Sequence, residues 1–365
     1  MSNLDFIVKR DDLSTTTLVE AKPITPNEGQ AVLSVERFAL TANNITYGVA
    51  GDLIGYWQFF PCVAEGQGRI PVWGIATVTA ENASELAVGD RYYGYFPMSN
   101  ELLVTPTKVS SRGFTDGVEH RAELPIVYNQ YTKVSSDNGF EPGMDNHKML
   151  YAPLFTTSFV LDDFFADNDD FGAKTVVLGS ASSKTAFGMA FMLKRSGRVK
   201  VIGLTSEKNA SFVAGLGLYD EVTTYGKVTE LDAEVATAYV DMSGNPEVLS
   251  SIHHHFTKNL VHSCAVGITH WESRQEQAMD ALPGAKPTMF FAPSQIVKRN
   301  KEWGAAQYQA RLAEATSAFL EQVDNWVKIK EHSFKTVDEI YQEVLIGAPA
   351  NEAVIVVMGE ANKGG

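Results

Sequence analysis

The fold is decided by the stretch Thr175-Val-Val-Leu-Gly-Ser-Ala-Ser-Ser-Lys-Thr-Ala-Phe-Gly188. Its first four residues are β-branched or apolar and predict a buried strand, whereas Thr185 to Lys194 have the apolar content of a packed helix. Small residues form the turn between the two. A second apolar run, Lys200-Val-Ile-Gly-Leu204, begins a few residues after the helix. This order of strand, turn, helix and strand predicts a βαβ unit.

The turn inside this unit is a candidate phosphate-binding site, because a helix that starts just after a strand points its first backbone N–H groups at the turn. The candidate residues are Ser180, Ser182, Ser183, Lys184 and Thr185. Two other interpretations remain open. One is a tight polar connection with an exposed lysine. The other is a P-loop, and with it an ATP-binding protein, because Ser183-Lys184-Thr185 resembles the end of that motif. The P-loop is less favoured, since Leu178 and Ser183 stand where it has glycine.

The chain on the two sides of this unit has different patterns. Short strands separated by Gly, Pro and Asp turns continue to about residue 125 and predict an all-β module. Inside this region, Thr41–Gly48 is interpreted as a polar loop, and residues 113–147 as a linker or insertion near a cleft between domains. From residue 151 on, strands and helices alternate, which predicts a parallel, doubly wound sheet. We expect an α/β protein with a β-rich domain over 1–150, a parallel-sheet domain over 151–300 and a segment over 301–365 that returns to the first domain.

Composition and charge exclude several classes of protein. The 365 residues suffice for two domains, and 44% hydrophobic and 20% charged residues are typical of ordinary globular proteins. The net charge of −14 is spread along the chain without a basic block, so nucleic acid is not an expected partner. The sequence has neither a signal-peptide pattern nor an apolar run of membrane-spanning length. Because Cys62 and Cys264 are too few for a disulfide framework, we expect a reducing cytoplasm.

Several motifs, taken in order, resemble those of one known superfamily of enzymes. Val88-Gly-Asp-Arg-Tyr-Tyr-Gly94 is similar to a VGDRV-x-G turn, and Ile70-Pro-Val-Trp-Gly74 is similar to a P-x-x-x-G approach to the second strand. Phe334–Gly347 followed by Ala353–Val357 resembles a closing helix and final strand. Together they resemble the medium-chain dehydrogenase/reductase superfamily, in its zinc-free branch of quinone and enoyl reductases, through a little-characterised family. Members of that branch have a glycine-rich turn that binds the pyrophosphate. In this chain, Ser180, Ser183 and Ala186 occupy the positions that correspond to those glycines.

The resemblance implies a GroES-like β module, a Rossmann-type sheet that binds the cofactor, a small-molecule substrate and a homodimer. The end of the second strand distinguishes the two nicotinamide cofactors. Here Thr205, Ser206 and Lys208 favour NADPH, while Glu207 counts against it unless it points outward. The other strand ends that would face the cofactor add the candidates Tyr225, Ser243, Gly244, Val266, Gly267 and Phe291. Simple tight turns are the alternative interpretation of these strand ends.

Zinc is not expected in this chain. Cys62 lies in an apolar loop and Cys264 inside a strand, so neither has a suitable ligand set. The three histidines His253-His254-His255 cannot converge on one ion, because neighbours on a helix point about 100° apart. We interpret them as a solvated helix face.

Without zinc, hydrogen bonds must polarise the substrate carbonyl, which suits hydride reduction of an α,β-unsaturated carbonyl compound or a quinone. Tyrosine keeps its proton at neutral pH and can still share it, so the catalytic candidates are Tyr47, Tyr56, Asn44 and Tyr128. Secondary candidates nearby are Asn43, Asn129 and Tyr131, and an apolar pocket would be walled by Trp57, Phe59 and Phe60. The alternative for each tyrosine is an aromatic ring that only packs in a core. The alternative function is a non-catalytic NADPH-binding redox sensor or partner subunit.

Overall fold

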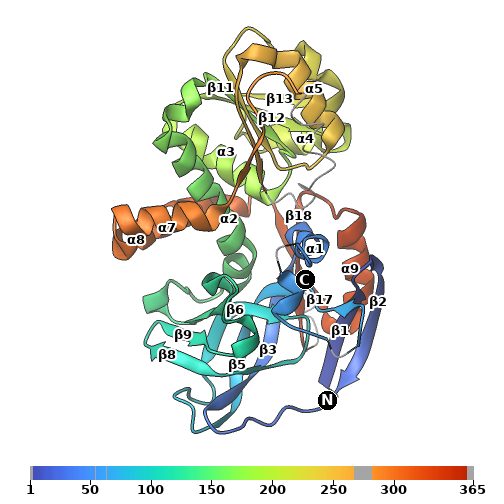
Figure 1. The fold of residues 1–365 in the computed structure, drawn as a ribbon, viewed down its shortest axis with the longest axis vertical. Helices are drawn as coiled ribbons and strands as arrows, with labels where there is room; N and C mark the ends of the chain where they lie inside the picture. The colour runs from blue at the N-terminus through green and yellow to red at the C-terminus, as the bar shows by residue number, and fades with distance from the viewer. Residues whose placement is uncertain (1–2, 54, 63, 267–281, 360–365) are drawn as a thin grey trace. The chain divides into compact units, whose positions relative to one another are not determined.

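The structure, a computed structural model, describes residues 3–53, 55–62, 64–266 and 282–359, and it divides into two compact units (Figure 1). The first unit combines the residues up to Leu150 with those from Lys328 on, and the second runs from Tyr151 to Val327. The chain leaves the first unit within a long helix, α2 (Asp145–Asp167), and re-enters it at strand β17 (Lys328–Ser333). Each sheet of the described residues belongs to one unit.

The first unit is built on two β-sheets. In the described ranges the larger one has the order β17-β18-β3-β5-β6-β10-β9-β8, with β7 paired to β3. Its remaining strands are β3 (Gln30–Leu40), β5 (Pro71–Asn82), β6 (Arg91–Pro97), β7 (Glu101–Val104), β8 (Pro106–Ser110), β9 (Gly113–Asp116), β10 (Gln130–Lys133) and β18 (Glu352–Val357). The smaller sheet has the order β2-β1-β4, from β1 (Asn3–Lys9), β2 (Asp12–Ala21) and β4 (Gln67–Gly68).

Helix α9 (Val337–Ile346) packs its apolar face on the β1–β2 hairpin, as Figure 1 shows. The rings of Phe6 and Tyr341 have centroids 5.1 Å apart, and both side chains are fully buried. At the rim, the Gln342 amide donates to the Ser14 carbonyl at 2.8 Å. The end of the chain therefore contributes to the core of the first unit.

Two predictions for the first unit are wrong. Thr41–Gly48, predicted as a polar loop, is mostly helical, because α1 spans Ala42–Val49 and the Thr41 N–H donates to Asn44 Oδ1 at 2.7 Å, which caps the helix start. Residues 113–147, predicted as a linker, supply β9 and β10 to the larger sheet and the first residues of α2. Polar side chains that cap a helix give no periodic pattern in the sequence. Short strands whose backbone hydrogen bonds go to strands far along the chain give none either.

The second unit contains the predicted doubly wound sheet, whose described strands are all parallel in the order β13-β12-β11-β14-β15-β16. The strands are β11 (Thr175–Gly179), β12 (Lys200–Thr205), β13 (Glu221–Thr224), β14 (Thr237–Asp241), β15 (Leu260–Val266) and β16 (Thr288–Phe290). The helices of its described residues, besides α2, are α3 (Lys184–Ser196), α4 (Glu207–Gly215), α5 (Pro246–Phe256), α7 (Ala292–Glu302) and α8 (Ala305–Val323). The strand order reverses at β11 and β14, and ligands bind at the carboxyl ends of strands at such a point.

Helices α7 and α8 lie side by side and pack on α2 (Figure 1). The ring of Phe319 on α8 stacks on that of Phe155 on α2, with centroids 4.4 Å apart. Arg299 on α7 forms ion pairs with Asp163 at 2.7 Å and Asp167 at 2.9 Å. Across the described ranges, every helix is too short or too polar to cross a membrane.

Candidate functional site

The turn between β11 and α3 is short and held in an unusual backbone conformation. Ser180 has a φ of 52°, in the left-handed region that residues other than glycine rarely adopt. The Ser183 N–H donates to the Ser180 carbonyl at 2.8 Å, and Ser183 Oγ then accepts the Ala186 N–H as the cap of α3. The first-turn N–H groups of α3 therefore point into the turn. Leu178 is buried within β11, so the turn is too short for the longer nest of a P-loop.

Close contacts with two buried tyrosines fix this turn. A Cβ atom on Gly179 would lie 2.6 Å from the Tyr239 hydroxyl, so only glycine fits there without displacement. On the other side, the Tyr219 hydroxyl donates to the Ala181 carbonyl at 2.7 Å. A Cβ atom on Gly203 would lie 2.9 Å from the Tyr219 ring. Both glycines therefore allow the tyrosine rings to support the turn directly.

The turn carries one cationic side chain, that of Lys184. Burial lowers the pKa of Lys184 to about 8. The neighbouring hydroxyl groups have partners within the unit, since Asn209 Nδ2 donates to Ser182 Oγ at 3.1 Å. Tyr225 is also close: burial raises its pKa, while hydrogen bonds with the backbone and side chain of Ser180 lower it. The predicted residues Ser180, Ser182, Lys184 and Tyr225 thus lie together.

At the end of β12, the predicted residues are exposed to different degrees. Thr205 is buried, whereas Ser206 is half-buried and Lys208 is exposed. Glu207 Oε1 accepts a hydrogen bond from Thr224 Oγ1 at 2.5 Å. The acidic side chain is exposed, and its carboxylate is held at the end of β13.

The turn after β14 is organised by one carboxylate. Asp241 is buried, and its Oδ1 accepts the N–H groups of Ser243 at 2.9 Å and Gly244 at 3.1 Å. The same oxygen accepts the Ser243 hydroxyl at 2.7 Å and the Tyr239 hydroxyl at 3.2 Å. Tyr239 therefore connects the β14 turn to Gly179 in the neighbouring strand.

The remaining predicted cofactor residues belong to the next two strands. Val266 ends β15 and is half-buried, and Phe291 is 45% exposed where α7 begins. Gly267 lies outside the described residues.

In the first unit, the catalytic candidates form an aromatic cluster around Tyr47 on α1. The Tyr47 oxygen accepts hydrogen bonds from Asn43 Nδ2 at 2.8 Å and Trp73 Nε1 at 3.3 Å. With both lone pairs engaged, the hydroxyl proton is the part of Tyr47 that can still be given to another group. Burial raises the pKa of Tyr47, while the two N–H donors lower it. Tyr47 is thus held protonated beside two groups that would stabilise its phenolate.

Tyr56 and Tyr128 complete this cluster, with their hydroxyl oxygens 3.1 Å apart. The Tyr56 ring lies 4.6 Å from that of Tyr47 between centroids. Asn44 is buried and donates to the Pro71 carbonyl at 3.0 Å, so it secures α1 to β5. Tyr131 bonds instead to the Tyr95 carbonyl at 2.7 Å.

Several residues of the cluster were not predicted, and some predicted ones have structural roles. Trp73 and Tyr95 belong to the cluster, but each occupies an ordinary strand position, Tyr95 buried and Trp73 half-buried, so no sequence signal distinguishes them. Buried packing positions are taken by Trp57, Phe59 and Phe60. Asn129 is buried as well, and it donates to the Arg121 carbonyl at 2.9 Å.

The interpretation of the three histidines as a solvated face is wrong for His253. This side chain is fully buried, with Nδ1 2.9 Å from the Pro283 carbonyl and Nε2 3.0 Å from Ser263 Oγ. It fills the contact between α5 and β15, which the sequence alone does not reveal. Among the described residues, no group of three His, Cys, Asp or Glu side chains is placed to hold a metal ion.

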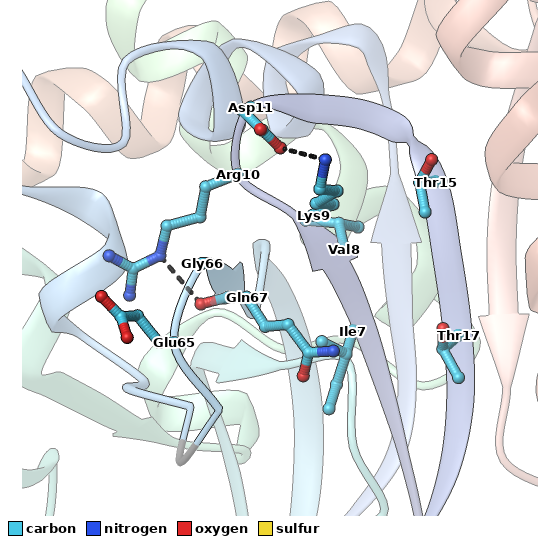
Figure 2. Close-up of a pocket in the computed structure, with 10 residues that line it drawn as sticks. All are labelled: Ile7, Val8, Lys9, Arg10, Asp11, Thr15, Thr17, Glu65, Gly66 and Gln67. Atoms are coloured by element: carbon cyan, nitrogen blue, oxygen red, sulfur yellow. Dashed lines mark hydrogen bonds and ion pairs between the residues drawn. The ribbon is translucent and has the colours of Figure 1, made fainter.

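A pocket of about 370 Å³ lies on the β1–β2 hairpin, as Figure 2 shows. Arg10 Nε donates to the Gln67 carbonyl at 2.8 Å, and Lys9 pairs with Asp11 at 3.1 Å. None of the predicted site residues lines this pocket. Each unit therefore has its own candidate site: the turn region in the second unit and the aromatic cluster in the first.

Comparison with known proteins agrees with this fold. Residues 38–349 match the model of a family described as "Protein of unknown function (DUF2855)". No curated protein sequence matches the chain. Among solved structures, CurA from Vibrio vulnificus in complex with NADPH is 15% identical with a TM-score of 0.62, covering 98% of this chain and 99% of its own.

Two further structures have comparable similarity. A mycobacterial protein complexed with NADPH is 13% identical with a TM-score of 0.58, and the JamJ enoyl reductase is 12% identical with a TM-score of 0.60. Each comparison covers 98% of this chain and 100% of the other. The fold is that of these solved structures, a GroES-like β module and a Rossmann-type parallel sheet, as the sequence predicted.

Proposed function

The chain belongs to the family described as protein of unknown function DUF2855. For this member of the family we propose an NADPH-dependent, zinc-independent reductase of α,β-unsaturated carbonyl compounds or quinones. The observation that carries the proposal is Tyr47, a buried phenol whose oxygen accepts two N–H donors. Solved structures of the same fold that contain NADPH support the cofactor.

The second unit fits the diphosphate and adenosine parts of NADPH. The diphosphate would lie at the turn over Gly179, next to the start of α3 and Lys184, since first-turn N–H groups and a cation both attract phosphate. Ser206, Lys208 and Tyr225 would hold the 2′-phosphate. The Glu207 carboxylate would repel the negatively charged 2′-phosphate, and the ammonium group of the adjacent Lys208 would offset this repulsion.

In the proposed reaction, NADPH bound in the second unit would supply a hydride for the β-carbon of the enone. The electron pair of the double bond moves toward the carbonyl oxygen, and the resulting enolate takes a proton at its α-carbon. Tyr47 provides this proton. Its phenolate is then stabilised by the N–H groups of Asn43 and Trp73, which already point at the oxygen before reaction. Tyr56 and Tyr128 share one hydrogen bond between their hydroxyls, and the hydroxyl that accepts it would donate its own proton to the enolate oxygen.

Thermal-shift titration with NADPH, NADH and ATP tests the cofactor. We expect NADPH to raise Tm more than NADH, and ATP to have little effect. Lys208→Met should weaken the binding of NADPH about tenfold and leave the binding of NADH almost unchanged, because only NADPH has the 2′-phosphate. A stronger shift with ATP contradicts the proposal. NADPH binding without turnover of any enone or quinone in a panel identifies a non-catalytic binding protein.

The affinity for NADPH should depend on pH through Lys184. Only the protonated side chain attracts phosphate, and the pKa of Lys184 is lowered to about 8. We therefore expect a constant Kd below about pH 7.5 and a Kd that rises toward tenfold per pH unit above pH 8. Lys184→Met should give a weaker Kd without this rise. Calorimetric titrations between pH 6.5 and 9.5 measure both, and an identical pH profile in the two proteins would rule out a role for this charge.

A further inference from the structure

A row of aromatic rings leads away from the Tyr47 hydroxyl along β5 and β6. The ring of Trp73, which donates to Tyr47, stacks on Tyr93 with centroids 5.5 Å apart and an interplanar angle of 20°. The Tyr93 ring in turn lies 5.8 Å from that of Phe140. Trp73 and Tyr93 are only half-buried, so the row keeps accessible apolar surface.

The row ends at a cation. Lys148, near the start of α2, places Nζ 5.3 Å from the centroid of Phe140, within the range of a cation–π contact. Its side chain is half-buried, and burial lowers the pKa of Lys148. In the described ranges no carboxylate pairs with its ammonium group, and the nearby Asp145 is bound to Arg91 at 2.8 Å.

This arrangement favours a negatively charged ligand. An ammonium group that is partly removed from water without a counter-charge reduces stability, and the face of one ring offsets only part of that cost. A bound anion would offset the rest. One ammonium group matches one negative charge, so a carboxylate fits better than a phosphate dianion, which would leave an uncompensated charge in the same surroundings.

We propose that the substrate is an elongated enone or quinone with a carboxylate at its far end. Its apolar body would lie along Trp73 and Tyr93, and its carboxylate would bind Lys148. This inference rests on the proposed reductase function and adds the substrate class to it.

The main test is a set of aryl enones that carry a carboxylate on linkers of increasing length, each paired with its methyl ester. With the full chain and NADPH, the measured quantity is the ratio of the ester's KM to the acid's KM. We expect a ratio of about 10 to 100 for the best linker. Lys148→Met should abolish this ratio, Lys148→Arg should keep most of it, and Lys22→Met, which changes an exposed lysine of the same unit, should match the wild type. A wild-type ratio near 1, or a ratio that survives Lys148→Met, overturns the proposal.

Two further measurements separate this proposal from other causes. Lys148→Met removes a partly desolvated charge and keeps an apolar stem, so Tm should stay equal or rise. A lower Tm with an unchanged KM ratio identifies a structural lysine and overturns the proposal. Saturated acid and ester analogues, which cannot be reduced, are titrated by calorimetry. Tighter binding of the acid, lost in Lys148→Met, supports the anion site even if no enone is turned over, and equal binding overturns it.

Discussion

The Tyr47→Phe variant is expected to reduce enones with a kcat about a hundredfold to ten-thousandfold below the wild type, the usual contribution of a positioned general acid. The enone's KM should change little, because phenylalanine keeps the ring in the cluster; the change removes the proton donor and the oxygen that accepts from Asn43 and Trp73. Asn43→Leu should have a smaller effect, about tenfold, since it removes one of the two N–H groups that stabilise the phenolate. Steady-state kinetics with a fixed saturating NADPH concentration gives both values.

Tyr341→Phe is the matched control for this experiment. Tyr341 is fully buried in the same unit, and its hydroxyl has no hydrogen-bond partner among the described residues. Removal of the Tyr341 hydroxyl should leave kcat close to the wild-type value. If Tyr47→Phe behaves like this control, the proton comes from elsewhere, and Tyr56 and Tyr128 become the residues to vary.

The Gly179→Ala variant is expected to lose about 1–3 kcal/mol of unfolding free energy, the cost of forcing an extra methyl group into a packed site. The new Cβ would lie 2.6 Å from the Tyr239 hydroxyl, so the turn or the ring must move. Because the turn is the proposed diphosphate site, NADPH should also bind at least tenfold more weakly. Denaturant unfolding and NADPH titration measure the two effects.

A double variant shows whether this contact is the cause. Tyr239→Phe removes the clashing hydroxyl, so Gly179→Ala with Tyr239→Phe should cost less than the sum of the single changes. Recovery should be partial, because the ring carbons would still be 3.2 Å away and the bond to Asp241 is lost. Gly215→Ala, where a Cβ meets nothing within 4 Å, should be neutral. Wild-type NADPH affinity in Gly179→Ala would contradict the placement of the diphosphate.

Local patterns were sufficient for much of the second unit. Each strand of a parallel sheet covered on both faces is a run of apolar residues, and β11 and β12 both have this form, so composition along the chain predicts them. The turn residues between them are contiguous, which is why Ser180 to Thr185 could be located from the sequence. The direction of Glu207 could not, because its partner Thr224 belongs to a strand that begins after α4.

The sequence by itself determined the alternation of strands and helices, the position of the turn after β11 and the order of motifs that resembles the reductases, since all three depend on residues close together in the chain. Only the tertiary structure decided that α1 is a helix, that His253 is buried and that Trp73 donates to Tyr47. It also brought Lys148 to the end of the ring row that starts at Trp73. Apart from α1, whose cap lies within its own first turn, these features join different elements of the chain, and the free energy that fixes them comes from burial and hydrogen bonds between elements, which no local pattern records.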